Sequence, residues 1–284
     1  MTAPYMIHGP REPGLPLVLD SPHSGKRFPE DFGHAVSEKE LRDGEDCYVD
    51  ELFGAAPALG APLLAADFPR TYIDVNRHPG DIDPELVEGD WPHQYCPSGK
   101  AEIGKSLVWR TLDDGRPIYA RKLSPAEVKR RIERFHAPYH VALRGLLDAA
   151  HGRFGMVYHI NCHSMKAVAG KQSDDGAGRV RAEFVLGDRD GTSCEHGFTD
   201  FVRATLVAMG YDVKLNDPYK GVELVRAYSN PAARRHSLQV EINRRLYMNE
   251  ATLEKTEGFA QLEANLGRLL RAVAEYCRGN RERA

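Results

Sequence analysis

Short apolar runs alternate with longer segments of helical periodicity along this chain. Runs of roughly four to eight residues rich in Leu, Val and Ile, bounded by Gly, Pro or polar residues, predict buried strands. The most informative of these runs ends in Ser-Pro-His-Ser-Gly at 21–25, which fits neither a strand nor a helix interior. The predicted strands cover 15–19, 61–66, 154–161, 182–187 and 236–243, with a more exposed strand at 211–215.

Apolar residues spaced three and four apart predict amphipathic helices. The clearest helix begins at Ser124, which Pro125 and Glu127 follow in the usual helix-start pattern, and it is expected to end at Gly152. Pro138 lies inside this helix and is expected to kink it. Further helices are predicted over 37–41, 45–56, 194–209 and 252–277, whereas 1–14 is expected to be an irregular lead-in and 219–229 a hairpin or loop near the site.

The alternation of strands and helices predicts an α/β sandwich with a mixed central sheet. The absence of a repeat or linker indicates a single domain over residues 1–284. Residues 78–117 are rich in Gly, Pro and Asp and lack periodicity, so we expect an irregular excursion that covers the site as a lid.

Composition narrows the classes of function. Among 284 residues, 42% are hydrophobic and 28% are charged, and the formal net charge is −3, so neither a basic nucleic-acid-binding surface nor a membrane span is expected. The five cysteines are scattered and form no CxxC pair, which indicates reduced thiols in a cytoplasmic protein. No phosphate-binding glycine motif and no GxSxG elbow occurs.

Two histidines sit where predicted strands end. His23 follows the strand at 15–19, and His163 follows the strand at 154–161, where His159, Asn161 and His163 alternate with apolar residues and share one face. Ligands of open α/β sheets bind at the carboxyl ends of strands. His23 and His163 are therefore candidate metal ligands, although a histidine that satisfies a loop hydrogen bond is the alternative for each.

A mononuclear catalytic zinc commonly takes two histidines and one carboxylate, with water in the open position. Asp46 is the first choice for the carboxylate because it projects from the start of the helix predicted at 45–56, and Glu45 and Asp50 are the other candidates. Asp46 and Asp50 are four residues apart and are expected to share one face of that helix. The alternative for Asp46 is a charge that complements the helix dipole.

Glu241 is isolated on an otherwise apolar strand, where a lone carboxylate is costly unless it is paired or functional. It suits the general base that takes a proton from zinc-bound water. Cys162 is an alternative nucleophile, but on an alternating strand it faces away from His163. His136 and His140 lie one helical turn apart with no HExxH pattern around them, which favours structural roles.

Several long segments together resemble the N-formylglutamate amidohydrolase (N-formylglutamate deformylase) family. They are LDSPHSGKRFPEDF at 19–32, the segment from EDCYVDELF to TYIDVNR at 45–77, HINCHSM at 159–165, FVLGDRDGTSC at 184–194 and NPAARRHSLQVEINRRLYMNE at 230–250. More remotely, the order of His23, Asn76-Arg77, His163 and Glu241 is similar to that in zinc carboxypeptidases and aspartoacylases. One departure is Lys26, which stands where those families have a glutamate ligand, so the third ligand has to come from elsewhere.

The resemblance implies an α/β/α fold, one zinc per chain, and hydrolysis of N-formyl-L-glutamate to formate and L-glutamate in histidine breakdown. Such a substrate carries two carboxylates, and arginine binds a carboxylate through two parallel hydrogen bonds. Arg77, with Asn76 beside it, is the expected anchor for one carboxylate, and Arg70 is expected to stabilise the oxyanion. The candidates for the second carboxylate are Arg226, Arg244 and Arg245.

Three other readings remain open at this stage. A related zinc hydrolase could act on another N-acyl amino acid, because the sequence does not size the acyl pocket. A non-catalytic ligand-binding relative could retain the fold, although the intact His23, His163 and Glu241 argue against it. A cysteine hydrolase would use Cys162. In each case the expected partner is a small molecule.

Overall fold

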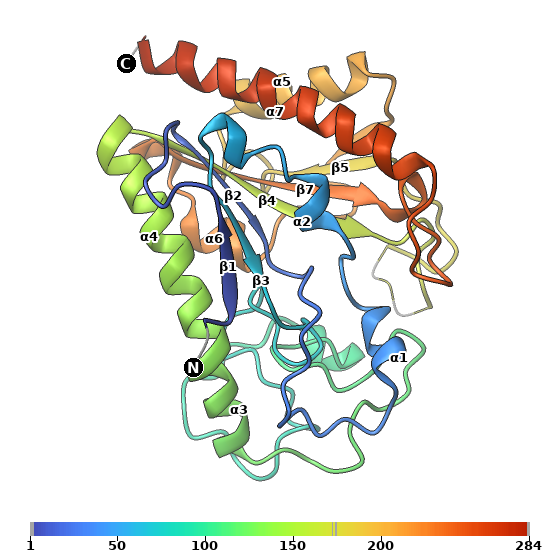
Figure 1. Cartoon of the computed structure of the whole chain (residues 1–284). Coiled ribbons are helices and arrows are strands. Elements are labelled where there is room, and N and C mark those ends of the chain that lie inside the picture. The colour runs from blue at the N-terminus through green and yellow to red at the C-terminus, as the bar shows by residue number, and fades with distance from the viewer. Residues whose placement is uncertain (1–2, 172, 174, 283–284) are drawn as a thin grey trace.

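A mixed seven-stranded sheet forms the centre of the molecule, seen in a computed structural model that describes residues 3–171, 173 and 175–282 (Figure 1). The order of the strands is β1-β3-β2-β4-β7-β5-β6. Strands β3, β2, β4 and β7 are parallel, whereas β1 pairs antiparallel with β3, and β5 pairs antiparallel with β7 and parallel with β6. The predicted mixed sheet is confirmed. The strands are β1 (Tyr5–His8), β2 (Leu17–Ser21), β3 (Leu63–Ala66), β4 (Val157–Met165), β5 (Phe184–Gly187), β6 (Val213–Leu215) and β7 (Arg235–Asn243).

Helices cover both faces of this sheet, which gives the expected three layers (Figure 1). Apolar residues of α2, α5 and α7 pack on one face, and those of α4 and α6 pack on the other. Across the described residues, no helix combines the length and apolarity that a membrane crossing requires. The helices are α1 (Glu38–Arg42), α2 (Val49–Leu52), α3 (Pro125–Arg131), α4 (Ala137–Phe154), α5 (His196–Ala208), α6 (Glu223–Tyr228) and α7 (Gly258–Glu282).

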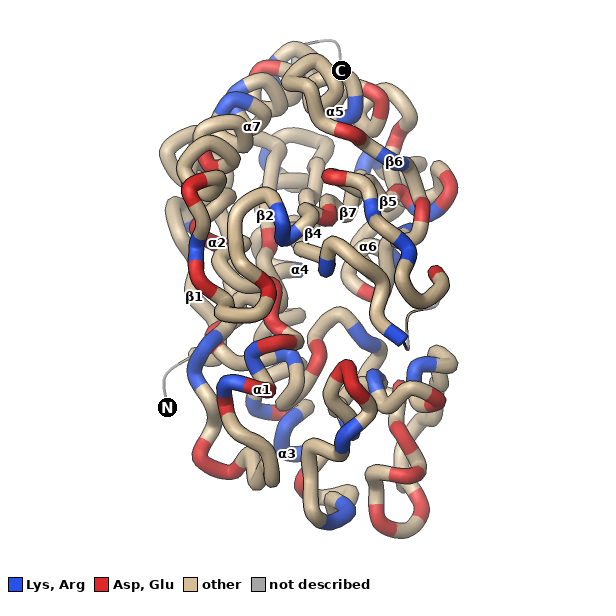
Figure 2. Tube along the Cα trace, turned by 90° about the vertical axis from the view of Figure 1, so that its right-hand side faces the viewer, with Lys and Arg blue, Asp and Glu red and all other residues tan. Residues whose placement is uncertain are grey.

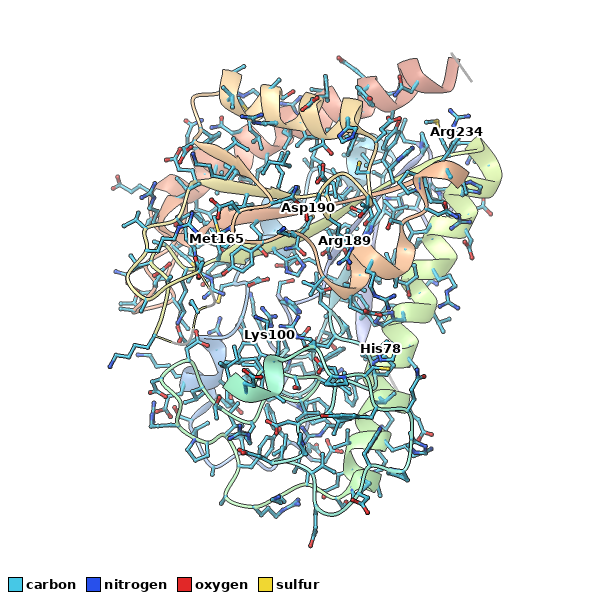
Figure 3. The ribbon with its side chains drawn as sticks, turned by 180° about the vertical axis from the view of Figure 1, so that it is seen from behind. His78, Lys100, Met165, Arg189, Asp190 and Arg234 are labelled. Carbon is cyan, nitrogen blue, oxygen red and sulfur yellow. The ribbon has the colours of Figure 1, made fainter. Side chains whose placement is uncertain are left out.

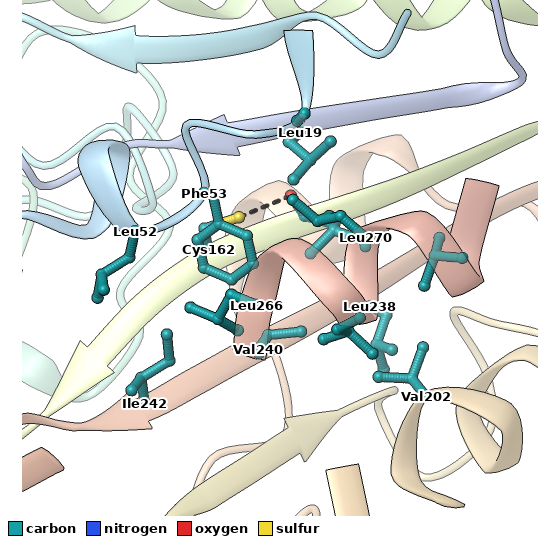
Figure 4. Packing of buried hydrophobic residues seen from close by; sticks show 14 of the residues in the cluster. Leu19, Leu52, Phe53, Cys162, Val202, Leu238, Val240, Ile242, Leu266 and Leu270 are labelled. Carbon is teal, nitrogen blue, oxygen red and sulfur yellow. Dashed lines mark hydrogen bonds between the residues drawn. The ribbon is translucent and has the colours of Figure 1, made fainter. Parts of the chain in front are cut away.

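Alternation along the central strands decides which side chains enter which layer. Leu238, Val240 and Ile242 of β7 point into the layer shared with α5 and α7, where Cys162 of β4 is also buried (Figure 4). The side chains between them, such as Glu241, face the other way, because successive residues of a strand point to opposite faces. The same strand therefore supplies both the hydrophobic core and the polar groups of the opposite face.

The four parallel strands place their carboxyl ends along one edge of the sheet. His23 follows β2, the segment 67–77 follows β3, and His163 and Glu241 lie near the ends of β4 and β7 as directly paired residues. Residues 78–117, in cyan to green in Figure 1, lie against this edge and contain a single turn of 3-10 helix at Lys100–Ile103. The backbone of this segment is mostly irregular, and several of its residues line the cavity described below; its role as a lid stays a prediction.

The helix predicted over 45–56 is wrong at both ends, since only Val49–Leu52 is helical and 53–56 are turns. The helix cannot begin earlier because Tyr48 has φ 64°, a left-handed conformation through which a right-handed helix cannot continue. Asp46 lies in the preceding turn, and its backbone N–H donates to the His23 carbonyl oxygen at 3.0 Å. Asp46 and Asp50 therefore do not share one helix face, and tertiary contacts override the local helical periodicity.

Other boundaries differ from the predictions for local reasons. The long helix passes Gly152 and ends at Phe154, where Gly155 takes φ 69°. Pro138 lacks an N–H, and the helix accommodates it with a π-helical turn at Ile132–His136. Residues 219–229 form neither a hairpin nor a plain loop, because 223–228 are helical, and the lead-in contains β1. The last helix begins at Gly258 rather than near 252.

We expect Leu238→Ala to lower the free energy of unfolding by about 2–5 kcal/mol, because its fully buried side chain would leave a cavity between β7 and the helical layer. Urea denaturation followed by circular dichroism measures the change. Val207→Ala is the matched control, since that side chain is 51% exposed. A loss below about 1 kcal/mol for Leu238→Ala would contradict the assigned packing.

Candidate metal centre and active-site cavity

His23, Asp46 and His163 come together in the structure. Their ligand atoms all lie within 4.8 Å of one another, and all three residues are buried. The Asp46 Oδ2 atom is 3.3 Å from His23 Nδ1 and 3.0 Å from His163 Nδ1. In a tetrahedral site with ligands at 2.0–2.1 Å, neighbouring ligand atoms are separated by about 3.3 Å, so both carboxylate–imidazole distances are close to the spacing of neighbouring metal ligands.

The other ring nitrogen of each histidine is held from outside this triangle. His23 Nε2 donates to Asp74 Oδ1 at 2.7 Å, and His163 Nε2 donates to Asn161 Oδ1 at 2.8 Å. Carboxylate and amide partners of this kind fix the tautomer and orientation of metal-binding histidines. Asp74 is ionised and can accept this hydrogen bond. Burial opposes its ionisation, but the positive charge of Arg70 and the contact with His23 keep its pKa well below the usual range.

Asn161 is oriented by a buried network on the same face of β4. Its Nδ2 atom donates to Asp20 Oδ1 at 2.8 Å, which leaves Oδ1 to face His163. His159 and Tyr139 also donate to the Asp20 carboxylate, at 2.9 and 2.8 Å, so the buried charge of Asp20 is well satisfied. The predicted alternation of His159, Asn161 and His163 along one face is confirmed by this chain of contacts.

The arrangement calls for a cation in the triangle. Burial lowers the pKa of His163, so its neutral imidazole has one N–H to offer. Asn161 Oδ1 at 2.8 Å is closer to His163 Nε2 than Asn76 Nδ2 at 3.2 Å, so we assign the proton to Nε2; Nδ1 then presents a lone pair to an Asp46 oxygen 3.0 Å away, which is also an acceptor. Burial opposes the ionisation of Asp46, but its contacts with the His163 and His23 imidazoles and the positive charge of Arg70 hold its pKa well below the usual range. The donor set of two histidines and one ionised carboxylate therefore fits a divalent metal.

Two arginines hold the carboxylates of the centre in place. Arg244 Nη2 donates to Asp46 Oδ1 at 3.2 Å, on the side away from the histidines, and Arg244 Nε donates to Ser164 Oγ at 3.1 Å. Arg70 Nη2 donates to Asp74 Oδ2 at 2.8 Å and lies 3.9 Å from Asp46. Removing either carboxylate would leave a buried guanidinium without its partner.

Glu241 lies beside the centre but is not part of the triangle. It is paired across the strands with His163, and Gln239 Nε2 donates to its Oε1 atom at 2.9 Å. Burial, reinforced by the negative charge of Asp46, raises the pKa of Glu241 well above the usual range. A carboxyl group with a high proton affinity, next to a metal site and open to the same cavity, is suited to accept a proton.

These groups line a cavity of about 420 Å³. Its walls come from the carboxyl edge of the sheet and from the irregular segment, as Met165 and Lys100 illustrate in Figure 3. The lining contains eight Lys and Arg residues against five Asp and Glu residues, although the whole chain carries a net charge of −3 and both signs are interspersed along it (Figure 2). The cavity is thus locally cationic and favours an anionic ligand.

Only some of the other candidate site residues chosen from the sequence line the cavity. Asn76, Arg77 and Arg244 line the cavity. Arg226 does not: it is exposed on α6 and pairs with Glu223 at 2.8 Å, while Arg245 is exposed near Glu183. Glu45 pairs with Arg42 rather than joining the triangle, and the group of three that could hold a metal contains neither Glu45 nor Asp50.

His136 and His140 have structural partners. His136 Nε2 donates to the Arg77 carbonyl oxygen at 2.9 Å, and His140 Nε2 donates to that of Val75 at 2.8 Å. Burial lowers the pKa of His140 to about 3, so its imidazole is neutral at pH 7. The two rings hold the segment that carries Asp74, Asn76 and Arg77 in place.

Cys162 is unsuited to nucleophilic attack. Its thiol lies within the hydrophobic layer, donates to the Ile160 carbonyl oxygen at 3.5 Å, and has a pKa raised well above the usual range by burial (Figure 4). It is also absent from the lining of the cavity. The alternative of a cysteine hydrolase using Cys162 has no support in this geometry.

Several residues that line the cavity were not predicted from the sequence. Lys105 and Lys166 both contact Asp113 at 2.9 Å, and Lys105 lies over the Trp109 ring. Arg181 comes from the loop before β5. These residues belong to segments without periodicity or motif, and the chain brings them to the cavity only through its tertiary fold.

Comparison with known proteins gives consistent results. A family model described as N-formylglutamate amidohydrolase matches residues 15–248. N-formylglutamate deformylase from Pseudomonas putida is 31% identical over 88% of this chain and 86% of its own, and that from Pseudomonas aeruginosa is 30% identical over 83% of each. The crystal structure of an N-formylglutamate amidohydrolase from Ralstonia eutropha JMP134 is similar with a TM-score of 0.91 and 49% identity, covering 98% of this chain and 100% of that one.

We expect His23→Ala and His163→Ala each to weaken metal binding by at least about tenfold, since even the loss of a hydrogen-bonding partner of a metal-binding histidine costs 10–100-fold. Elemental analysis of the purified variants, with circular dichroism to verify folding, measures the effect. His151→Ala is the matched control, because this histidine bonds the Ala233 carbonyl oxygen on the surface of α4. Wild-type metal content in both site variants would exclude the assigned ligands.

Proposed function

The chain belongs to the N-formylglutamate amidohydrolase family, and from this premise we propose that it is a zinc-dependent N-formylglutamate deformylase. The reaction is hydrolysis of the formyl amide of N-formyl-L-glutamate to formate and L-glutamate. The observation that carries the proposal is the triangle of His23, Asp46 and His163 beside the buried Glu241 in a cationic cavity. The family resemblance further suggests a place in histidine breakdown, and the five free cysteines are in keeping with a reducing cytoplasm.

The charge of the cavity supports a dicarboxylate substrate. Excess positive charge in the lining compensates for the two carboxylates that N-formylglutamate brings into a partly desolvated space. Arg77 is our choice for the first carboxylate: it lines the cavity, and its Nε donates to the Lys105 carbonyl oxygen at 3.1 Å, which orients the guanidinium. Asn76, next to it, accepts a hydrogen bond from the Leu224 N–H through its Oδ1 atom at 2.9 Å.

We assign zinc to His23 Nδ1, His163 Nδ1 and the Asp46 carboxylate. Two histidines and a carboxylate are a usual zinc donor set, and they leave one position open. When bound, zinc supplies a Lewis acid for the formyl oxygen and lowers the pKa of water in that position. Arg244 and Arg70 keep Asp46 ionised and in place, and Asp74 and Asn161 keep the imidazoles in the required tautomer.

Glu241 is the proposed general base and then the general acid. Its raised proton affinity lets it take the proton of the attacking water and deliver it to the amide nitrogen, so that the leaving amine departs neutral. Gln239 holds one of the Glu241 oxygens at 2.9 Å, which leaves the other for the proton. Arg70, buried at the cavity wall and positively charged, is positioned to stabilise negative charge on the formyl oxygen.

The direct test is formate release by the purified chain. We expect hydrolysis of N-formyl-L-glutamate, its loss after treatment with a chelator, and its return with added zinc. A panel containing N-acetyl-L-glutamate and N-acetyl-L-aspartate distinguishes this activity from that of a zinc amidohydrolase acting on another acyl group. Absence of turnover on the whole panel by zinc-loaded protein would leave a non-catalytic relative as the better description.

We expect Glu241→Gln to lower kcat about a hundredfold to ten-thousandfold while zinc remains bound, because it removes the proton acceptor and no proposed ligand. Zinc content, kcat and melting temperature, measured on this variant and on Asp46→Asn, distinguish a base from a ligand. Asp46→Asn should lose metal together with activity. Glu257→Gln is the surface control. Loss of zinc in Glu241→Gln would make Glu241 a ligand, and unchanged kcat would remove it from the mechanism.

A further inference from the structure

Arg181 forms a buried bidentate ion pair at the cavity wall. Its Nε and Nη2 atoms donate to the two oxygens of Asp175, both at 2.9 Å, and the two side chains are only 5% and 4% exposed. Arg181 also lies 5.2 Å from the centre of the Tyr219 ring. Arg181, Asp175 and Tyr219 all line the cavity. The Arg181 guanidinium thus has the geometry that binds a carboxylate through two hydrogen bonds, and Asp175 of the chain itself occupies this position.

This pair differs in one respect from the other arginine–carboxylate pairs of the cavity. Arg70 binds Asp74, which orients His23, and Arg244 binds Asp46, which belongs to the metal triangle. Those carboxylates cannot leave their arginines without disturbing the centre. Asp175 is outside the metal triangle and outside the contacts that orient its histidines. A ligand carboxylate can therefore replace Asp175 at Arg181 without disturbing the metal triangle.

The surroundings of Asp175 favour such an exchange. It lies in the polar segment between β4 and β5, near Gly176 and Gly178, which have φ 94° and 80° and nothing within 4 Å of the position of an added Cβ. Val180, further along, is 66% exposed. Arg181 is better anchored, since it also donates to the Lys166 carbonyl oxygen at 3.2 Å and lies three residues before β5. Displacement of Asp175 thus breaks few packing contacts and leaves Arg181 in position.

We propose that Arg181 binds the side-chain carboxylate of the N-formyl dicarboxylic amino acid, and that Asp175 occupies Arg181 until this carboxylate replaces it. The inference rests on the proposed function and fills the second anchoring position, which neither Arg226 nor Arg245 reaches. A substrate with an uncharged side chain cannot compensate Arg181 and leaves Asp175 in place. The exchange therefore selects for substrates with a second carboxylate. It also weakens substrate binding, because Asp175 occupies Arg181 in part of the protein molecules.

The test compares N-formyl-L-glutamate with N-formyl-L-glutamine, which has nearly the same shape and an uncharged side chain. We expect Arg181→Met to lower kcat/KM for N-formyl-L-glutamate by about 10- to 100-fold, mainly through KM, since it removes charge-assisted hydrogen bonds. The value for N-formyl-L-glutamine should change less than about threefold, and zinc content should stay at the wild-type level. Arg179→Met is the matched control, because Arg179 is on the same segment and pairs with Asp217 on the surface.

Asp175→Asn tests the exchange itself. This variant keeps the shape of the side chain and removes the competing charge, so we expect KM for N-formyl-L-glutamate to fall by about 2- to 10-fold with kcat retained. It also carries the test if Arg181→Met fails to fold. A raised KM in Asp175→Asn together with a lower melting temperature would show that the pair only anchors the segment, and would overturn the exchange.

The two hypotheses fail in different ways. If the wild-type protein discriminates between the two substrates and Arg181→Met preserves that preference, the assignment of Arg181 is wrong while the proposed function stands. If zinc-loaded wild-type protein releases formate from neither substrate, the proposed function is wrong and the assignment of Arg181 falls with it.

Discussion

The contact of the Asp46 carboxylate with the imidazoles of His23 and His163 is the interaction on which the site depends. The three residues come from a loop after β2, a turn before α2 and the end of β4, so no local sequence pattern holds them together. The turn that delivers Asp46 requires a left-handed residue at Tyr48 and a hydrogen bond from the Asp46 backbone to the His23 carbonyl oxygen.

Buried charge at the carboxyl edge is tolerated because almost every group has a partner of opposite charge or a hydrogen-bonding neighbour. Asp74 accepts from an imidazole and a guanidinium, Asp46 accepts from the Arg244 guanidinium and contacts two imidazoles, and the pKa values of both carboxylates are held well below the usual range despite burial. Glu241 lies in the same space but accepts a hydrogen bond from the uncharged Gln239, and burial together with the charge of Asp46 raises its pKa. Neighbouring carboxylates with pKa values shifted in opposite directions are suited to different tasks, which we propose are metal binding for Asp46 and proton transfer for Glu241.

The sheet explains why these polar groups and the core do not interfere. On β4 and β7 the alternation of side chains sends Cys162, Val240 and Ile242 into the hydrophobic layer and sends His163 and Glu241 to the other face. Behind His163, the chain of Asn161, Asp20 and His159 continues the polar face into the interior with its hydrogen bonds satisfied. The direct pairing of β4 with β7 thus fixes the spacing between His163 and Glu241.

Several features followed from the sequence alone because they depend on local rules. The apolar alternation predicted β4, β5 and β7. The position of His23 after a predicted strand and the isolation of Glu241 on an apolar strand marked both as candidates for the site, and both line the cavity, while their roles stay proposals. Other features were decided only by the tertiary structure. The backbone turn at Asp46, the helical state of 223–228, the surface position of Arg226 and the entry of Arg181 and Lys105 into the cavity result from contacts between segments far apart in the chain. Periodicity records which face of an element is buried, but it carries no information about which irregular segments meet, because their positions are set by packing and by charge pairing that exist only after the chain has folded.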